Sequence, residues 1–93
     1  MEVVYQLIFY KDALKDISYW KKSGNKQAIS KIDKIIEALE KNPYSLSPGE
    51  PEKLKYATGY SRRINKTDRI TYDINDATKE VVIFRMRGHY DDK

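Results

Sequence analysis

The only histidine of the 93-residue chain lies near its C-terminus, in a segment whose residue types could transfer protons. His89 stands beside Tyr90 and follows Arg85 and Arg87 at the end of an apolar run. Histidine is the side chain most often used for acid–base chemistry near neutral pH, because its ordinary pKa lies close to that pH. If the chain is an enzyme, His89 is the first candidate for its acid or base. Judged from this segment alone, a solvated surface histidine near a chain end is the more common situation.

A second set of chemically useful residues precedes the predicted sheet. Glu50 and Glu52 lie in a segment rich in proline, with Lys53 and Lys55 close by. A carboxylate, a histidine and several arginines are the components of metal-free RNA cleavage. One group removes the proton of the ribose 2′-hydroxyl, another protonates the departing 5′-oxygen, and the arginines stabilise the charge on the phosphate. DNA lacks the 2′-hydroxyl, so such a site would select RNA. The alternative for Glu52 is an ordinary loop charge paired with a neighbouring lysine.

All the arginines fall in the second half of a chain that carries a net charge of +4. A guanidinium stays charged and binds phosphate through two hydrogen bonds, so this segregation suggests an anionic partner such as nucleic acid. The alternative is a solvated surface, because a small positive charge is common in soluble proteins. The arginines are Arg62, Arg63, Arg69, Arg85 and Arg87.

The composition argues against several other classes of protein. The chain has no cysteine and one histidine, so it has no disulfide, no thiolate nucleophile and no conventional zinc site, and we expect neither a metal nor a cofactor. No apolar run approaches membrane-spanning length, and the N-terminus lacks the pattern of a secretory signal. We therefore expect a cytoplasmic protein with no membrane partner, formed by a single domain over residues 1–93.

Hydrophobic periodicity predicts a strand, two helices and then further strands. Apolar residues at helical spacing favour a first helix over Lys11–Lys22 and a second that ends before Pro43, with Gly24 and Asn25 as the stop and cap between them. The apolar stripe of the second helix could serve a coiled-coil partner, but it is too short for sustained heptads. The grouped elements predict an α+β fold with both helices on one face of an antiparallel sheet of four to five strands. The predicted strands are Val3–Phe9, Lys53–Ala57, Tyr60–Lys66, Arg69–Ile74 and Lys79–Arg87.

Side-chain alternation along these strands predicts which residues share a face. We expect the face covered by the helices to carry Ile64, Ile70, Tyr72, Val82, Phe84 and Met86. The uncovered face then carries Arg63, Arg69, Arg85, Arg87 and, if the chain stays extended past Gly88, His89. Like charges on neighbouring strands repel unless an anion joins them, so we favour an anion-binding face over a merely solvated one. Val81 and Ile83 fit this open face poorly and would need cover from a loop or a partner.

Several short motifs occur in the order typical of one protein family. Ile17-Ser18-Tyr19-Trp20 resembles its tyrosine–tryptophan helix, and Pro51-Glu52-Lys53-Leu54-Lys55 resembles its P-E-x-L-K motif. Gly59–Ile64 and Asp68–Tyr72 resemble its two arginine-containing strands, and Arg87-Gly88-His89-Tyr90 resembles its R-x-H-Y ending. Over nearly its whole length, the chain resembles the YoeB (Txe) branch of the RelE superfamily of bacterial toxins.

The resemblance implies a RelE-like fold and a toxin of a type II toxin–antitoxin system. Such toxins are ribosome-dependent endoribonucleases (mRNA interferases) that cut messenger RNA in the ribosomal A site and stop translation. The implied partners are the bacterial ribosome, the mRNA and a cognate antitoxin, and some members of the branch form homodimers. By motif matching, the implied roles are general base for Glu52, general acid for His89, stabilisation of the transition state for Arg69, orientation of the message for Tyr90, and phosphate or ribosomal RNA contacts for Lys55 and Arg63.

The chain departs from the family pattern at two places. Asp68 stands where the family often has histidine, and it could pair with Arg69 and lower the availability of that cation. Asp91-Asp92-Lys93 follow the usual terminal tyrosine, and acidic groups near His89 would favour its protonated form.

Two rival hypotheses keep the same sequence features. One is a ParE-like toxin that inhibits DNA gyrase through protein contacts and has no need of Glu52 and His89 as an acid–base pair. The other is a non-enzymatic nucleic-acid-binding module that uses the arginine face, because phosphate contacts position a partner without specifying what happens to it.

Overall fold

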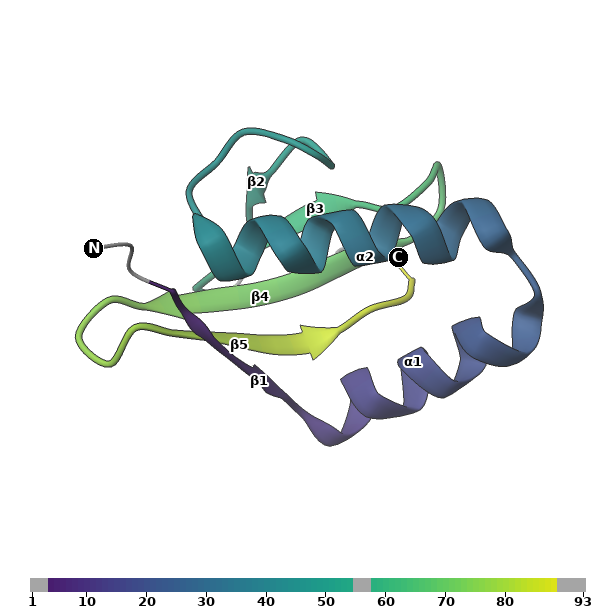
Figure 1. Cartoon of the computed structure of the whole chain (residues 1–93), viewed down its shortest axis with the longest axis horizontal. Helices are drawn as coiled ribbons and strands as arrows, with labels where there is room; N and C mark the ends of the chain where they lie inside the picture. Colours follow the sequence, from purple (N-terminus) through teal and green to yellow (C-terminus); the bar gives the residue numbers. More distant parts are fainter. Residues whose placement is uncertain (1–3, 55–57, 89–93) are drawn as a thin grey trace.

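Two helices pack against a single sheet in the computed structural model, which describes residues 4–54 and 58–88 (Figure 1). The sheet has five strands in the order β1-β5-β4-β3-β2. β1 runs parallel to β5, and the other neighbours are antiparallel. The predicted α+β fold is thus confirmed, with one parallel edge strand that makes the sheet mixed. The elements are β1 (Gln6–Phe9), α1 (Lys11–Ser23), α2 (Lys26–Lys41), β2 (Glu52–Lys53), β3 (Tyr60–Arg63), β4 (Arg69–Asn75) and β5 (Glu80–Arg85).

The boundary between the helices follows the local sequence signals. α1 ends at Gly24, whose φ of 72° is the left-handed conformation that glycine adopts without steric cost. The side chain of Asn25 caps α2 by accepting a hydrogen bond from the backbone N–H of Ala28 at 3.0 Å. α2 ends at Lys41, just before Asn42 and Pro43. These caps and the helix ends were predicted from the sequence and are confirmed.

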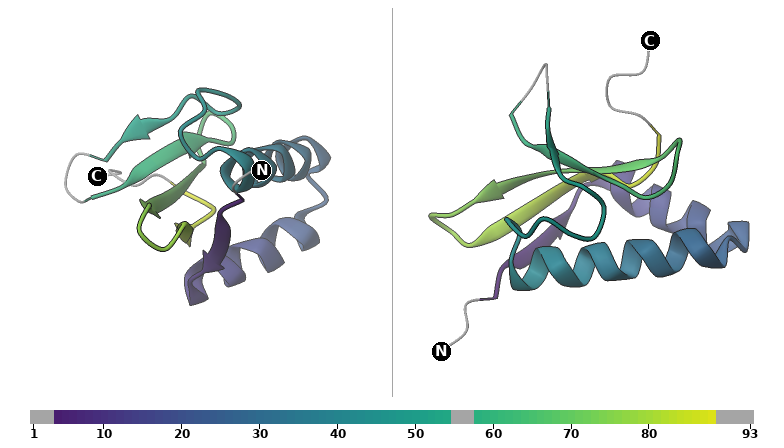
Figure 2. Two further views of the ribbon diagram at one scale, coloured as in Figure 1. Left: turned by 60° about the vertical axis from the view of Figure 1, so that its left-hand side comes forward. Right: turned by 90° about the horizontal axis from the view of Figure 1, so that it is seen from above.

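The core lies between the two helices and one face of the sheet, and the opposite face of the sheet carries no helix (Figure 2). None of the helices in the described ranges is long and apolar enough to cross a bilayer. The fully buried apolar side chains of the helices and strands come from α1, α2, β4 and β5, and they include Ala13, Ile35, Leu39, Ile70, Tyr72, Val81 and Ile83.

The predicted faces of β5 are wrong over most of the strand. Val81 and Ile83 were expected on the uncovered face, but both are 0% exposed in the core. Val82 and Phe84 were expected in the core and are only partly buried. Met86, however, is buried as predicted, with 1% exposure.

A β-bulge explains this change of face. In the pairing of β5 with β4, Ile83 lies opposite Tyr72 and Arg85 lies opposite Thr71, so Phe84 is one extra residue on its strand. An extra residue reverses the alternation of side chains beyond it. Val81 and Ile83 therefore point to the core before the bulge, whereas Arg85 takes the side of Thr71 after it.

Arg62 ties the loop between α2 and β2 to the sheet from inside the core. Its side chain is 0% exposed. Its guanidinium donates hydrogen bonds to the hydroxyl of Tyr72 at 2.9 Å and to the carbonyl oxygens of Pro43, Ser45 and Pro48 at 3.1, 2.7 and 3.2 Å. Burial raises the pKa of Tyr72, and the hydrogen bond from Arg62 opposes that rise. Arg62 therefore fixes the path of the loop that leads to Glu52.

Replacing Arg62 by methionine would keep most of the apolar volume and remove every donor to this loop. We expect Arg62→Met to lower the free energy of unfolding by about 2 kcal/mol or more, because buried carbonyl groups lose their partners. Urea unfolding followed by circular dichroism measures this loss. The matched control is Arg63→Met, whose half-exposed side chain should change the free energy by about 0.5 kcal/mol or less. Equal losses in the two variants would contradict the role of Arg62.

Candidate functional site

Glu52 and Arg69, two of the predicted site residues, meet on the uncovered face of the sheet. Arg69 Nη1 lies 3.1 Å from Glu52 Oε1, and the same nitrogen donates to Ser61 Oγ at 3.2 Å. The side chain of Arg69 is 13% exposed, whereas that of Glu52 is 60% exposed. The guanidinium is therefore held in place between β2 and β3, and the carboxylate remains open to a substrate.

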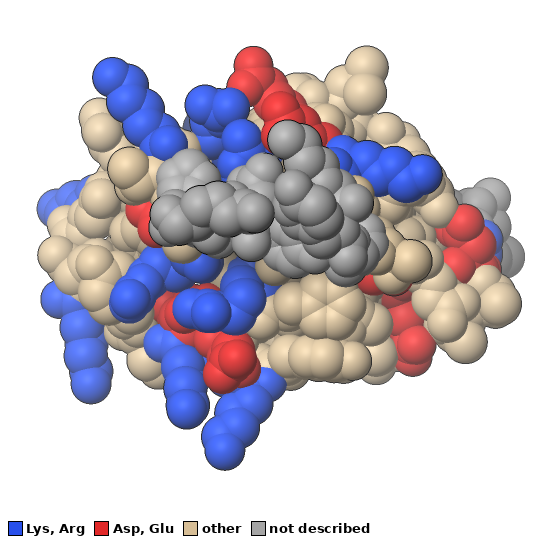
Figure 3. All heavy atoms as spheres, turned by 180° about the vertical axis from the view of Figure 1, so that it is seen from behind, with Lys and Arg blue, Asp and Glu red and all other residues tan. Residues whose placement is uncertain are grey.

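The strand register extends this pair into a polar row. Residues directly opposite one another in a sheet share a face. Glu52, Ser61, Thr71 and Arg85 are successive register partners across β2, β3, β4 and β5, and Arg63 lies opposite Arg69. Arg63, Arg69 and Arg85 thus share the uncovered face, as the alternation predicted. Basic side chains, interspersed with acidic ones, gather on this face (Figure 3).

The loop before β2 packs closely against β3, and this contact positions Glu52. The backbone N–H of Arg63 donates to the carbonyl of Gly49 at 2.6 Å. Gly49 has a φ of 97°, and a Cβ atom there would lie 3.0 Å from Arg62 Cβ and 3.1 Å from the Arg63 carbonyl oxygen. Only glycine fits this position. Glu50 follows in the left-handed region at φ 50° and places its Oε1 3.7 Å from Arg63 Nε.

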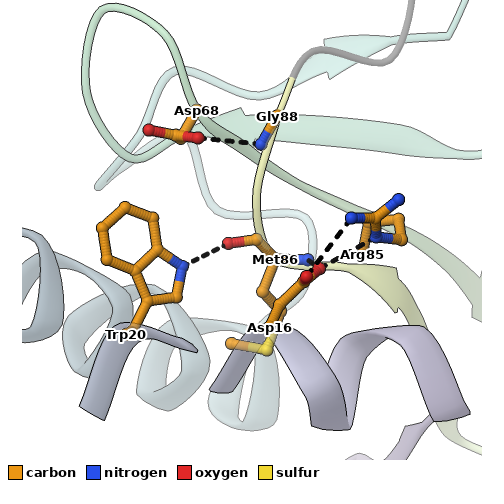
Figure 4. Close-up of polar contacts among 6 residues, drawn as sticks. All are labelled: Asp16, Trp20, Asp68, Arg85, Met86 and Gly88. Carbon is orange, nitrogen blue, oxygen red and sulfur yellow. Dashed lines mark hydrogen bonds and ion pairs between the residues drawn. The ribbon is translucent and has the colours of Figure 1, made fainter. Parts of the chain in front are cut away.

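Gly88, the residue that precedes His89, contacts the backbone at the start of β4, next to the side chain of Arg69. The backbone N–H of Arg69 donates to the carbonyl of Gly88 at 3.0 Å. The N–H of Gly88 donates to Asp68 Oδ1 at 2.8 Å (Figure 4). The described contacts of the Asp68 carboxylate are to Gly88 and Thr67, so the suggested pairing of Asp68 with Arg69 is wrong in this structure.

Arg85 and Arg87 both contact α1. Arg85 Nε lies 2.9 Å from Asp16 Oδ2, and this hydrogen bond is the main reason that the pKa of Arg85 is raised. The guanidinium of Arg87 lies 3.9 Å from the centre of the Tyr19 ring, a cation–π contact. The expected cluster of arginines is therefore divided between the Glu52 side of the sheet and α1.

Three predicted site residues, Lys55, His89 and Tyr90, lie outside the described residues, so their roles remain predictions. Two other residues were missed. Ser61 contacts Arg69 but gave no chemical signal of its own in the sequence. Asp16 is a buried carboxylate at 4% exposure, and its position on the apolar face of the first helix could have revealed it.

Known proteins share both the sequence and the fold. The family described as the YoeB-like toxin of bacterial type II toxin-antitoxin system matches residues 9–90. The chain is 31% identical over 87 residues to Toxin YoeB of Escherichia coli O6:H1, covering 91% of this chain and 99% of the relative. The YoeB dimer from Staphylococcus aureus matches with a TM-score of 0.78 at 31% identity, over 92% of this chain and 98% of that chain. The heterotetrameric YoeB-YefM complex from the same organism matches with a TM-score of 0.73 at 32% identity and the same coverage.

Substituting Gly49 tests whether the loop positions the carboxylate. Gly49→Ala would place a methyl group against Arg62 and Arg63 at an unfavourable φ, so we expect lower stability and altered NMR signals of Glu52 and Arg69. The matched control is Gly24→Ala, where φ is also positive at 72° but no atom lies within 4 Å of the added Cβ. It should cost about 1 kcal/mol of stability and leave those signals unchanged. Unchanged Glu52 and Arg69 signals in Gly49→Ala would show that this close approach does not set the site.

Proposed function

Since the chain belongs to the YoeB-like toxins of bacterial type II toxin–antitoxin systems, a branch of the RelE superfamily, we propose that it is a ribosome-dependent endoribonuclease that cuts messenger RNA in the ribosomal A site. The ion pair of Glu52 and Arg69 on the uncovered face is the observation that carries the proposal. It combines an exposed carboxylate, which can accept a proton, with a fixed guanidinium, which can bind a phosphate.

Glu52 would act first, as the base that removes the proton of the ribose 2′-hydroxyl. The 2′-oxygen then attacks the adjacent phosphorus, and the bond from phosphorus to the 5′-oxygen of the next nucleotide breaks. His89 would give its proton to that 5′-oxygen, so the products are a 2′,3′-cyclic phosphate and a free 5′-hydroxyl. Each proton transfer of this kind contributes about 10²- to 10⁴-fold to a rate. These proton transfers and the attack on phosphorus need neither a metal nor a redox cofactor.

Arg69 would stabilise the negative charge that grows on the phosphate oxygens during the attack. In the structure its guanidinium is shared between Glu52 and Ser61. A substrate phosphate would compete with Glu52 for this cation, and Ser61 would keep the guanidinium in place during the exchange. The same event frees the carboxylate to bind the 2′-hydroxyl.

Other residues would bind and orient the message. Arg63 lies opposite Arg69 in the sheet, and its half-exposed side chain places Nε 3.7 Å from the Glu50 carboxylate, so a phosphate could replace that carboxylate as its partner. We assign phosphate or ribosomal RNA contacts also to Lys55, Arg85 and Arg87, and orientation of the reacting nucleotide to Tyr90.

The proposal includes a set of protein partners. The Staphylococcus aureus relatives form a YoeB-YefM complex and a YoeB dimer. We propose by similarity that this chain binds a cognate antitoxin, forms homodimers and acts on the ribosome in the cytoplasm.

Message-end mapping in a reconstituted bacterial translation system tests the activity. We expect the parent to cut inside the codon in the ribosomal A site. Glu52→Gln and His89→Gln should each lower the cleavage rate by about 100-fold or more, because each removes one proton transfer. Glu50→Gln is the matched control, since Glu50 is in the same loop, is 81% exposed and pairs with Arg63 at 3.7 Å. It should retain most of the rate.

Two results would contradict the proposal. Cleavage that neither Glu52→Gln nor His89→Gln weakens would remove the assigned acid–base roles. Translation without arrest, together with inhibition of purified DNA gyrase, would favour a ParE-like activity instead.

A further inference from the structure

The segment Met86–Gly88, which directly precedes His89, is held by hydrogen bonds from two separate parts of the fold (Figure 4). At its first residue, the N–H of Met86 donates to Asp16 Oδ2 at 2.8 Å, and the carbonyl of Met86 accepts from Trp20 Nε1 at 2.7 Å. Both partners belong to α1, one turn apart. Both polar groups of the Met86 backbone therefore bind one helix.

The carboxylate of Asp16 that accepts from Met86 is buried. It is 4% exposed, and a buried carboxylate is stable only when charge and hydrogen bonds compensate its lost hydration. Arg85 supplies two of those bonds, from Nε at 2.9 Å and from Nη2 at 3.2 Å. The third comes from the Met86 N–H. The carboxylate therefore binds two consecutive residues, the last residue of β5 and the one that follows it.

The other end of the segment is fixed by the turn between β3 and β4. Gly88 donates its N–H to Asp68 Oδ1 at 2.8 Å and accepts from the Arg69 N–H at 3.0 Å. Asp68 is itself held in the turn, because its N–H donates to Asn65 Oδ1 at 2.8 Å and its Oδ2 accepts from Thr67 Oγ1 at 3.0 Å. The N–H of Gly88 thus binds Asp68, and its carbonyl binds the neighbouring residue, Arg69.

We propose that Asp16, Trp20 and Asp68 are positioning residues that fix Met86–Gly88 beside Arg69, and that His89 can act as the general acid only when this preceding segment is fixed. This inference rests on the proposed ribonuclease function. The three side chains do not act on the substrate themselves. They fix the polypeptide on which the general acid is carried, and a displacement of about 1 Å can cost about 100-fold in rate.

The test of the turn end compares Asp68→Ala with Asp68→Asn. Asparagine keeps an oxygen that can accept from the Gly88 N–H, whereas alanine does not. We expect Asp68→Ala to lower the single-turnover cleavage rate at saturating toxin by about 10- to 100-fold, with little change in the toxin concentration that gives half the maximal rate. Asp68→Asn should restore most of the rate.

Asp76→Ala is the matched control for a loss of stability. Asp76 lies in the turn between β4 and β5, at the opposite end of β4, and accepts hydrogen bonds from Tyr5 at 2.8 Å and Tyr44 at 2.5 Å. Its loss removes comparable contacts without touching Gly88. Asp76→Ala should therefore keep the cleavage rate, and a rate loss equal to that of Asp68→Ala would overturn the positioning role.

The test of the helix end uses Trp20→Phe, which keeps an aromatic ring in the core and removes the donor to the Met86 carbonyl. We expect a lower single-turnover rate in this variant as well. Asp16→Asn retains an acceptor for the Met86 N–H and loses the charge that Arg85 binds. It should therefore be less impaired than Asp16→Ala, and equal rates for these two variants would contradict the Asp16 assignment.

NMR separates this inference from the proposed activity. The chain has one histidine and one tryptophan, so the His89 imidazole and the Trp20 indole each give an unambiguous signal. Asp68→Ala should shift or broaden the His89 signals, whereas Asp68→Asn and Asp76→Ala should leave them unchanged, and the Trp20 signal should report whether the Met86 end of the segment stays bound to α1. Unchanged His89 signals in Asp68→Ala would overturn the positioning role even if the parent cuts RNA. A parent without ribonuclease activity would remove the proposed function, whatever the His89 signals show.

Discussion

The guanidinium of Arg62 lies inside the core, and its described partners are main-chain carbonyls and the hydroxyls of Tyr72 and Ser45 rather than a carboxylate. A buried charge costs several kcal/mol unless its donors are satisfied, so the loop that supplies these carbonyls must follow one path. Along that path Gly49 packs against β3, and Glu52 pairs with Ser61 of the same strand. The exposed carboxylate of the candidate site therefore depends on a cation that no substrate touches.

A complementary constraint acts on the C-terminal side of the site. Asp16 and Asp68 each direct a carboxylate at a backbone N–H of the segment after β5. One belongs to α1 and the other to the turn before β4, so the segment bridges the helical layer and the sheet. The described part of the site is consequently assembled from a loop, a strand and the segment Met86–Gly88, each held by its own buried or half-buried polar contacts. Arg69 is where the three meet.

Much of this arrangement could be predicted from local patterns. The helices, their caps and the order of the elements along the chain follow from periodicity and from glycine, asparagine and proline at the expected places, whereas the parallel pairing of β1 with β5 was not predicted. Alternation also placed Arg63, Arg69 and Arg85 on one face. It failed for Val81 and Ile83, because the bulge at Phe84 reverses the alternation and leaves no signal in a continuous apolar strand.

By itself, the sequence determined the types of the elements, the motif order that indicates the family, and the residues capable of acid–base chemistry. Only the tertiary structure decided which charges meet. Arg62 and Arg63 are adjacent and identical in type, yet one is buried against loop carbonyls and the other lies beside Glu50 on the surface. Asp68 precedes Arg69 in the chain, yet it binds Gly88. Local periodicity reports backbone geometry within one element, whereas the partner of a charge depends on strand register and loop paths set by contacts distant in sequence.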